Sequence, residues 1–77
     1  MSTPGLSAVA SWVVRSLREH PELRLPEAIA IGPESDGSDV PAVREALAEL
    51  QHRGLAKQDD DGGWQLTERG RQSAAYT

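Results

Sequence analysis

The densest group of chemically capable side chains is the acidic segment KQDDDGG, residues 57–63, which is followed by Glu68. Asp59, Asp61, Gly62 and Glu68 match four positions of the loop pattern D-x-D-x-D-G-x5-E that binds calcium through carboxylates. Lys57 occupies the first ligand position, and a hairpin rather than a helix is expected around the segment. We therefore interpret the aspartates as a solvated turn, and we predict no metal site and no cofactor.

Side chains that could carry catalysis are sparse. The chain has no cysteine and only two histidines, His20 and His52, both near the ends of expected helices, where a cation complements the helix dipole. Its hydroxyl side chains accompany no glycine-rich elbow, and no carboxylate pair is expected on a buried element. A length of 77 residues also leaves little room for a cleft. We predict that the protein is not an enzyme.

A third group lies on the amphipathic stretch VPAVREALAELQHRG, residues 40–54. Ser38 or Asp39 is a suitable helix cap, Pro41 fits the first turn, and Gly54 is a natural residue after the last turn. A helical projection gives a buried stripe of Val43, Ala46, Leu47 and Leu50. The outward arc is Pro41, Glu45, Ala48 and His52, flanked by Arg44 and Glu49.

This outward face has side chains that could bind a nucleic acid or a protein. Arg44 could donate two hydrogen bonds to guanine, and Glu45 could accept one from cytosine. The candidate binding residues are Pro41, Ala42, Arg44, Glu45, Ala48, His52, Arg53 and Lys57. A basic stripe for phosphates would require that Arg44, Arg53, Lys57, Arg69 and Arg71 share one face.

The elements that position these residues follow from periodicity and from helix breakers. Ser7 caps a helix that runs to about Glu19, with Val9, Trp12, Val13 and Leu17 on one arc and Val14 off it. The alternating stretch Glu22–Leu25 predicts a brief edge strand. A short helix, Pro26–Ile31, directs Ala28, Ile29 and Leu25 toward the core, and Gly32–Asp39 forms a loop.

A hairpin is predicted after the amphipathic helix. Residues 56–58 form its first strand, DDDGG its five-residue turn, and the returning strand places Trp64 and Leu66 on one face. Both tryptophans, Trp12 and Trp64, are expected in the core. Residues Thr67–Gly70 end the strand, and the tail RQSAAYT is either a short helix or frayed.

The order of these elements resembles the winged helix-turn-helix family. AVREALAELQHRGLA, residues 42–56, is similar to the recognition helix and first wing strand of MarR-, PadR- and ArsR-like bacterial regulators, and LTERGR, residues 66–71, is similar to the strand ending after their wing. The resemblance implies an α+β winged helix of three helices, a short strand and a two-stranded wing. The domain spans residues 7–71, between a flexible leader, 1–6, and a tail, 72–77.

The resemblance implies a small transcriptional regulator that binds DNA, and the thin core of so short a chain favours a dimer. A chain without a signal peptide or a long apolar segment is expected in the cytoplasm, with no membrane contact. Two features depart from the family: the loop before the amphipathic helix has eight residues instead of about 3 to 4, and the wing tip is acidic.

Charge favours a different partner. Twelve acidic residues against eight lysines and arginines give a formal charge of −4, whereas a DNA-binding domain usually carries a basic patch. The alternative is a protein-interaction module, an adaptor or subunit whose acidic surface meets a basic partner or mimics nucleic acid. A further alternative is an assembly module that uses the first helix, indicated by Val14, Ala74, Ala75 and Tyr76.

Overall fold

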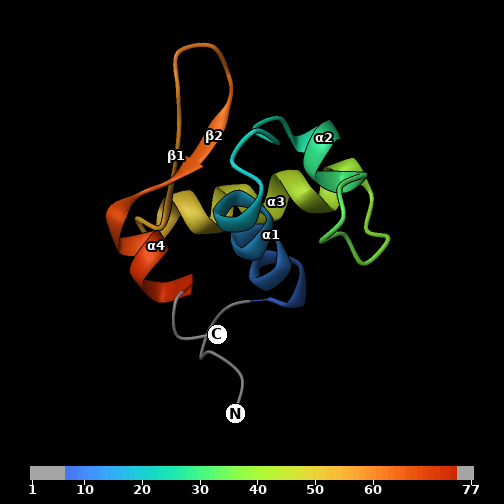
Figure 1. Ribbon diagram of the computed structural model, residues 1–77, viewed down its shortest axis with the longest axis horizontal. Coiled ribbons are helices and arrows are strands. Elements are labelled where there is room, and N and C mark those ends of the chain that lie inside the picture. The colour runs from blue at the N-terminus through green and yellow to red at the C-terminus, as the bar shows by residue number, and fades with distance from the viewer. Residues whose placement is uncertain (1–6, 75–77) are drawn as a thin grey trace.

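The computed structural model describes residues 7–74, with side chains through residue 72, and over this range it shows an α+β domain. Its helices are α1 (Ala8–Glu19), α2 (Pro26–Ala30), α3 (Val40–His52) and α4 (Glu68–Ala74). Its strands, β1 (Ala56–Gln58) and β2 (Trp64–Leu66), form one antiparallel sheet. In Figure 1 α1 lies across α3, with α2 toward one end of α3 and the hairpin and α4 toward the other. The predicted leader, 1–6, and residues 75–77 of the predicted tail lie outside the described residues.

The predicted helix caps are confirmed at both long helices. The Ser7 hydroxyl accepts a hydrogen bond from Ala10 N at 3.1 Å, and the Asp39 carboxylate accepts one from Ala42 N at 3.1 Å. These side chains satisfy amide groups that have no partner within the helix. At the other end of α3, Gly54 has a φ of 75°. Leu55 N then donates to Leu50 O at 2.8 Å, the closing bond of a Schellman motif.

The core lies between α1 and α3 and continues under the sheet. All four residues of the predicted α3 stripe are buried, and so are Trp12 and Trp64, as predicted. Val14, expected off the apolar arc of α1, is only 5% exposed, because α1 packs against α4 and β2 as well as α3. Leu25, expected in the core, is 49% exposed, since it occupies the N-cap of α2 with an extended backbone.

The predicted hairpin is confirmed in its strands and its turn. Ala56 pairs with Leu66, Lys57 with Gln65 and Gln58 with Trp64. Residues 59–63 form the five-residue turn, where Gly62 has a φ of 88° that a side chain would disfavour. Ala56, Trp64 and Leu66 are buried, whereas Lys57 is exposed. The alternation therefore directs one face of the hairpin to the core.

The edge strand predicted at Glu22–Leu25 is wrong, because these residues form no strand. The chain turns directly after α1, and Pro26 starts α2 before a ladder can extend. One hydrogen bond, from Trp64 N to Arg24 O at 2.7 Å, joins this segment to β2.

The prediction that Thr67–Gly70 ends a strand is also wrong, and the described part contains four helices rather than three. The Thr67 hydroxyl accepts from Gly70 N at 3.1 Å and so caps α4. The helix continues through residues 72–74, beyond the predicted domain boundary at residue 71, in agreement with the helical alternative for the tail. None of the helices in the described part has the length and apolar character needed to span a membrane.

Candidate functional site

The eight candidate binding residues gather along α3 and the start of the hairpin. Seven of them are exposed: Pro41, Arg44, Glu45, Ala48, His52, Arg53 and Lys57. Ala42 is half-buried. The amphipathic pattern therefore located an accessible face, with its outward arc as expected.

Both arginines on this face contact carboxylates. Arg44 Nη2 lies 3.0 Å from Glu27 Oε1, which joins α3 to α2. The pKa of Glu27 lies below its ordinary value, first because its carboxylate accepts a backbone hydrogen bond and second because it accepts one from Arg44. At the other end of α3, Arg53 Nε lies 3.6 Å from Glu49 Oε2. Carboxylates therefore offset the charge of both arginines.

A groove runs between the start of α1 and α3, and we call it the α1–α3 groove. Its volume is about 320 Å³, and it is lined by Ser7, Val9, Ala42, Glu45, Ala46 and Glu49. Val9, Ala42 and Ala46 provide apolar surface. Glu45 has no hydrogen bond or ion pair to another described residue, whereas Glu49 Oε2 accepts from Ser7 N at 3.4 Å. Apolar surface beside two carboxylates suits an aliphatic chain that ends in a cation.

Arg24 holds the tip of the hairpin, a contact that the sequence pattern did not predict. Its Nη2 atom lies 2.9 Å from Asp59 Oδ2 and 3.0 Å from Asp61 Oδ1. The pKa of Asp61 is lowered, first because Gly63 N donates to its carboxylate at 2.9 Å and next because Arg24 donates to it. The acidic segment is thus partly neutralised from within the chain. Among the described residues, no three carboxylate or imidazole side chains gather to hold a metal ion.

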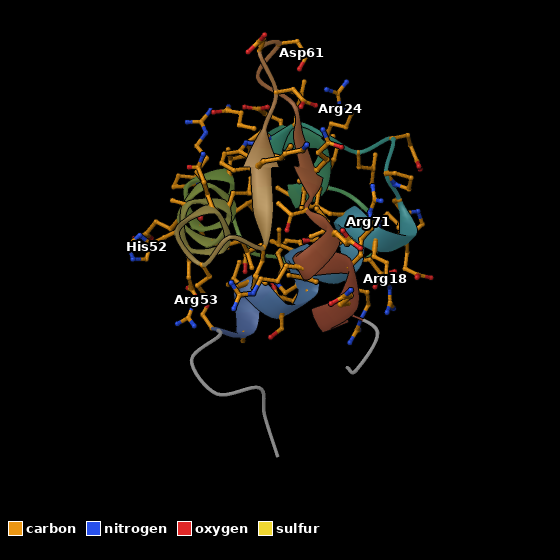
Figure 2. All side chains as sticks on the ribbon, turned by 90° about the vertical axis from the view of Figure 1, so that its left-hand side faces the viewer. Arg18, Arg24, His52, Arg53, Asp61 and Arg71 are labelled. Atoms are coloured by element: carbon orange, nitrogen blue, oxygen red, sulfur yellow. The ribbon has the colours of Figure 1, made fainter. Side chains whose placement is uncertain are left out.

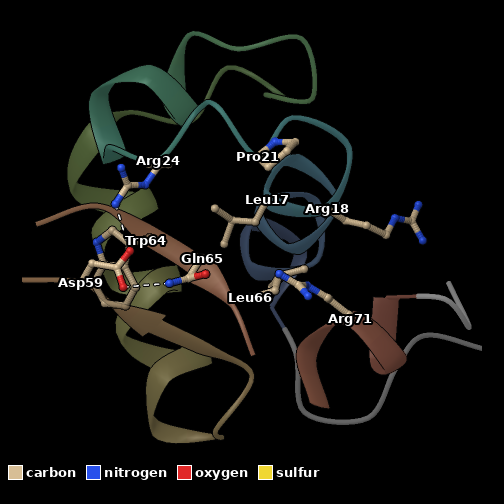
Figure 3. A pocket seen from close by; sticks show the side chains of 9 residues that line it. All are labelled: Leu17, Arg18, Pro21, Arg24, Asp59, Trp64, Gln65, Leu66 and Arg71. Atoms are coloured by element: carbon tan, nitrogen blue, oxygen red, sulfur yellow. Dashed lines mark hydrogen bonds and ion pairs between the residues drawn. The ribbon is translucent and has the colours of Figure 1, made fainter. Parts of the chain in front are cut away.

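A second hollow, which we call the β2-edge cavity, lies between the end of α1, β2 and α4. Its volume is about 480 Å³. It is lined by Leu17, Arg18, Pro21, Arg24, Asp59, Trp64, Gln65, Leu66 and Arg71. Figure 3 shows Leu17 between Pro21 and Leu66, with Arg18 and Arg71 at one end and Arg24 at the other. Because the lining residues come from four separate segments, no local motif marks this cavity.

The cations are divided between two sides of the molecule. In Figure 2 His52 and Arg53 lie on one side of the hairpin, whereas Arg18 and Arg71 lie on the other. A stripe that joins Arg53 to Arg71 would have to cross the hairpin between them. The α3 face and the β2-edge cavity are therefore separate candidate sites.

In comparisons with known proteins, no protein family, no curated protein and no solved structure matches the chain. The candidate sites therefore rest on their geometry and chemistry.

Proposed function

We propose that the protein is a winged-helix binding module that recognises a cationic segment of a partner protein through the α1–α3 groove. The observation that carries this proposal is the distribution of charge on α3. Glu45 borders the apolar surface of the groove and has no ion pair to another described residue, whereas Arg44 is engaged by Glu27 and Arg53 by Glu49. In this interpretation α3 is the recognition helix and the β1–β2 hairpin is the wing.

The groove fits the side chain of a lysine or arginine. The aliphatic stem would lie over Val9 and Ala46, and the charged end would approach Glu45, beside the Glu49 carboxylate that Arg53 engages. An exposed ion pair contributes on the order of 0 to 1 kcal/mol, so most of the affinity must come from apolar contact around it. The expected interaction is weak, and it weakens further as salt is added.

The proposal can be tested with a fluorescently labelled lysine-rich peptide in an anisotropy titration. Glu45→Gln removes one carboxylate from the groove and should weaken binding about threefold to fivefold, the effect of roughly 0.7 to 1 kcal/mol. Asp60→Asn is the matched control, since it removes the same charge at the hairpin tip. Equal weakening by both variants would show that the affinity depends only on the net charge of the protein, and the proposed groove site would be rejected.

DNA binding as a small, dimeric bacterial regulator in the cytoplasm is the second candidate function. It is favoured by the order of α1, α2, α3 and the hairpin, and by the exposure of Arg44 and His52 on α3 and of Lys57 on β1. In this interpretation Arg44 reads a base edge and Lys57 contacts a phosphate.

The same variants separate the two functions. DNA is repelled by carboxylates, so Glu45→Gln and Asp60→Asn should both strengthen binding to a duplex. A titration at several salt concentrations counts the phosphate contacts, and Lys57→Gln should lower the magnitude of that slope by about one if Lys57 makes such a contact. Absence of salt-dependent binding to any duplex at low salt would eliminate the DNA function.

A further inference from the structure

The outer edge of β2 has main-chain groups that β1 does not use. The hairpin ladder alternates between hydrogen-bonded and non-bonded pairs. Asp59 N donates to Gly63 O at 2.7 Å, and Thr67 N donates to Leu55 O at 3.0 Å. Because the two kinds of pair alternate between these bonds, Lys57–Gln65 is a hydrogen-bonded pair. The pairs on either side of it, which contain Trp64 and Leu66, are non-bonded. The main-chain polar groups of Trp64 and Leu66 therefore point away from β1.

Among the described residues, Trp64 N is the only one of these outward groups with a hydrogen-bond partner. Trp64 N donates to Arg24 O at 2.7 Å, in the position where a third strand would begin. The chain then leaves the edge as Pro26 starts α2. Trp64 O and Leu66 N consequently have no hydrogen-bond partner among the described residues. An open strand edge of this kind is a template for another extended segment.

The β2-edge cavity is lined by the two residues that carry these groups, Trp64 and Leu66. Leu17, Pro21 and Leu66 supply apolar lining. A segment that paired with Trp64 O and Leu66 N would place alternate side chains against this apolar surface. The cavity therefore offers both main-chain bonds and apolar contact to the same extended segment.

Three arginines and one aspartate, Asp59, line the cavity, so positive charge predominates there although the chain as a whole is acidic. Arg24 already binds Asp59 and Asp61, and Arg18 Nε lies 2.9 Å from Glu19 Oε2. Arg71 is exposed, and no ion pair joins it to another described residue. Figure 3 shows Arg71 beside Leu66 at the rim. A carboxylate that entered here would meet a guanidinium that no carboxylate of the described chain engages.

We propose that the β2-edge cavity binds a short extended segment of a partner protein that carries an acidic side chain. The segment adds a third strand to the sheet by pairing with Trp64 O and Leu66 N, and its carboxylate meets Arg71. The open strand edge selects an extended backbone, and the arginine selects the charge. This site is separate from the α1–α3 groove, and the inference does not depend on the function proposed for that groove.

The probe is an acetylated and amidated pentapeptide of alternating threonine and valine with one central glutamate. Titration into the isotopically labelled protein should shift the backbone amide resonance of Leu66 in NMR spectra and slow its hydrogen exchange. A matched peptide with glutamine in place of glutamate should bind about threefold to tenfold more weakly, as expected for loss of one charge-assisted contact. An N-methyl group on the amide that faces Trp64 O should abolish binding.

Arg71→Gln should remove the preference for glutamate over glutamine, while Arg69→Gln, the same change on the same helix, should preserve it. Retention of the preference in Arg71→Gln would overturn the assignment of the carboxylate to Arg71. Binding of the N-methylated peptide would exclude strand addition. The proposal would be overturned if the peptide shifted only resonances of α3. It would also be overturned if the free protein had twice its expected mass and a second copy protected the Leu66 amide from hydrogen exchange.

Discussion

The α1–α3 groove and the β2-edge cavity are formed at opposite ends of α1 and offer opposite charge. Ser7 and Val9, at the start of α1, line the first, where Glu45 and Glu49 are the charged groups. Leu17 and Arg18, near its end, line the second, whose rim holds three arginines. Both combine apolar surface with charge, so the difference between them is one of sign.

The net charge of −4 therefore describes neither site. What matters is which charges are already matched within the chain. Arg44 and Arg24 come from different elements, and each is engaged by carboxylates of another. Glu45 and Arg71 have no such match among the described residues. Unmatched charges beside apolar surface are available to a partner, and matched charges are available only after an internal ion pair breaks.

The largest expected effect comes from Gly70→Ala, which should damage the β2-edge cavity and spare the α1–α3 groove. A side chain at residue 70 would collide with the carbonyl group of Leu55. That carbonyl cannot move freely, because it accepts from Thr67 N while Leu55 N donates to Leu50 O. Alanine normally stabilises a helix interior by about 1 kcal/mol over glycine. Overpacking costs about 1 to 3 kcal/mol, so we expect net destabilisation in urea unfolding.

Arg69→Ala is the control for Gly70→Ala, because it changes an exposed residue of the same helix. It should leave the free energy of unfolding nearly unchanged. In the folded fraction of Gly70→Ala, the pentapeptide should no longer bind, while the lysine-rich peptide should bind as before. Equal loss at both sites would show that the two ends of α1 are not independent.

Ser16→Ala should have a smaller effect of opposite sign. Ser16 is fully buried on α1, and its hydroxyl has no hydrogen-bond partner within the described part of the chain. Removing a buried, unpaired hydroxyl should stabilise the protein by about 1 kcal/mol, with a contribution from the better helix propensity of alanine. Thermal unfolding measures the gain. Ser11→Ala, an exposed change on the same helix, should give little or none.

Because α1 serves both sites, Ser16→Ala also separates stability from binding. Both peptides should bind the variant with unchanged affinity. A change at one site alone would show that the hydroxyl positions that end of α1, and a loss of stability would show that Ser16 has a partner in solution.

The parts of the fold that depend on short-range signals were predictable. Asp39, Gly54 and the apolar stripe define α3, and DDDGG defines the hairpin turn, since caps and tight turns are set by neighbouring residues. LTERG shows the limit of this approach. Thr67 was expected to end a strand, yet its hydroxyl donates to Gly54 O at 2.7 Å and accepts from Gly70 N, so a contact across 13 residues helps to fix the start of α4.

The candidate sites were predictable only in part. The exposed face of α3 follows from helical periodicity, but its ion pair with Glu27 depends on how α2 packs against α3. The contact between Arg24 and Asp61 spans 37 residues, and the β2-edge cavity joins four segments. No local pattern encodes such contacts, because they arise from tertiary packing. The acidic wing tip expected from the sequence is partly neutralised, because the fold places Arg24 beside two of its three aspartates.

The smallest predicted effect is the protonation of Asp61 at low pH, which should change the hairpin and leave α3 unchanged. The pKa of Asp61 is lowered by the Gly63 amide and by Arg24, so the folded hairpin favours the carboxylate. Its contribution is present above the pKa of the unfolded chain, about 3.9 for aspartate, and is lost as the pH falls through the lower folded pKa. The Gly63 amide resonance in NMR should report this transition below pH about 4.

Arg24→Gln should raise the pH midpoint of the Gly63 transition, because the hydrogen bond and the charge of Arg24 both lower the pKa of Asp61. The Gly63 hydrogen bond remains, so the midpoint should still lie below the ordinary value for aspartate. Arg44→Gln, which frees Glu27 at the other end of the molecule, is the control and should leave the Gly63 midpoint unchanged. Pentapeptide binding should also weaken in acid, because the glutamate of the peptide loses its charge near its ordinary pKa of about 4.3. An unchanged midpoint in Arg24→Gln would show that the backbone alone holds Asp61 ionised and that Arg24 has no part in shaping the cavity through this contact.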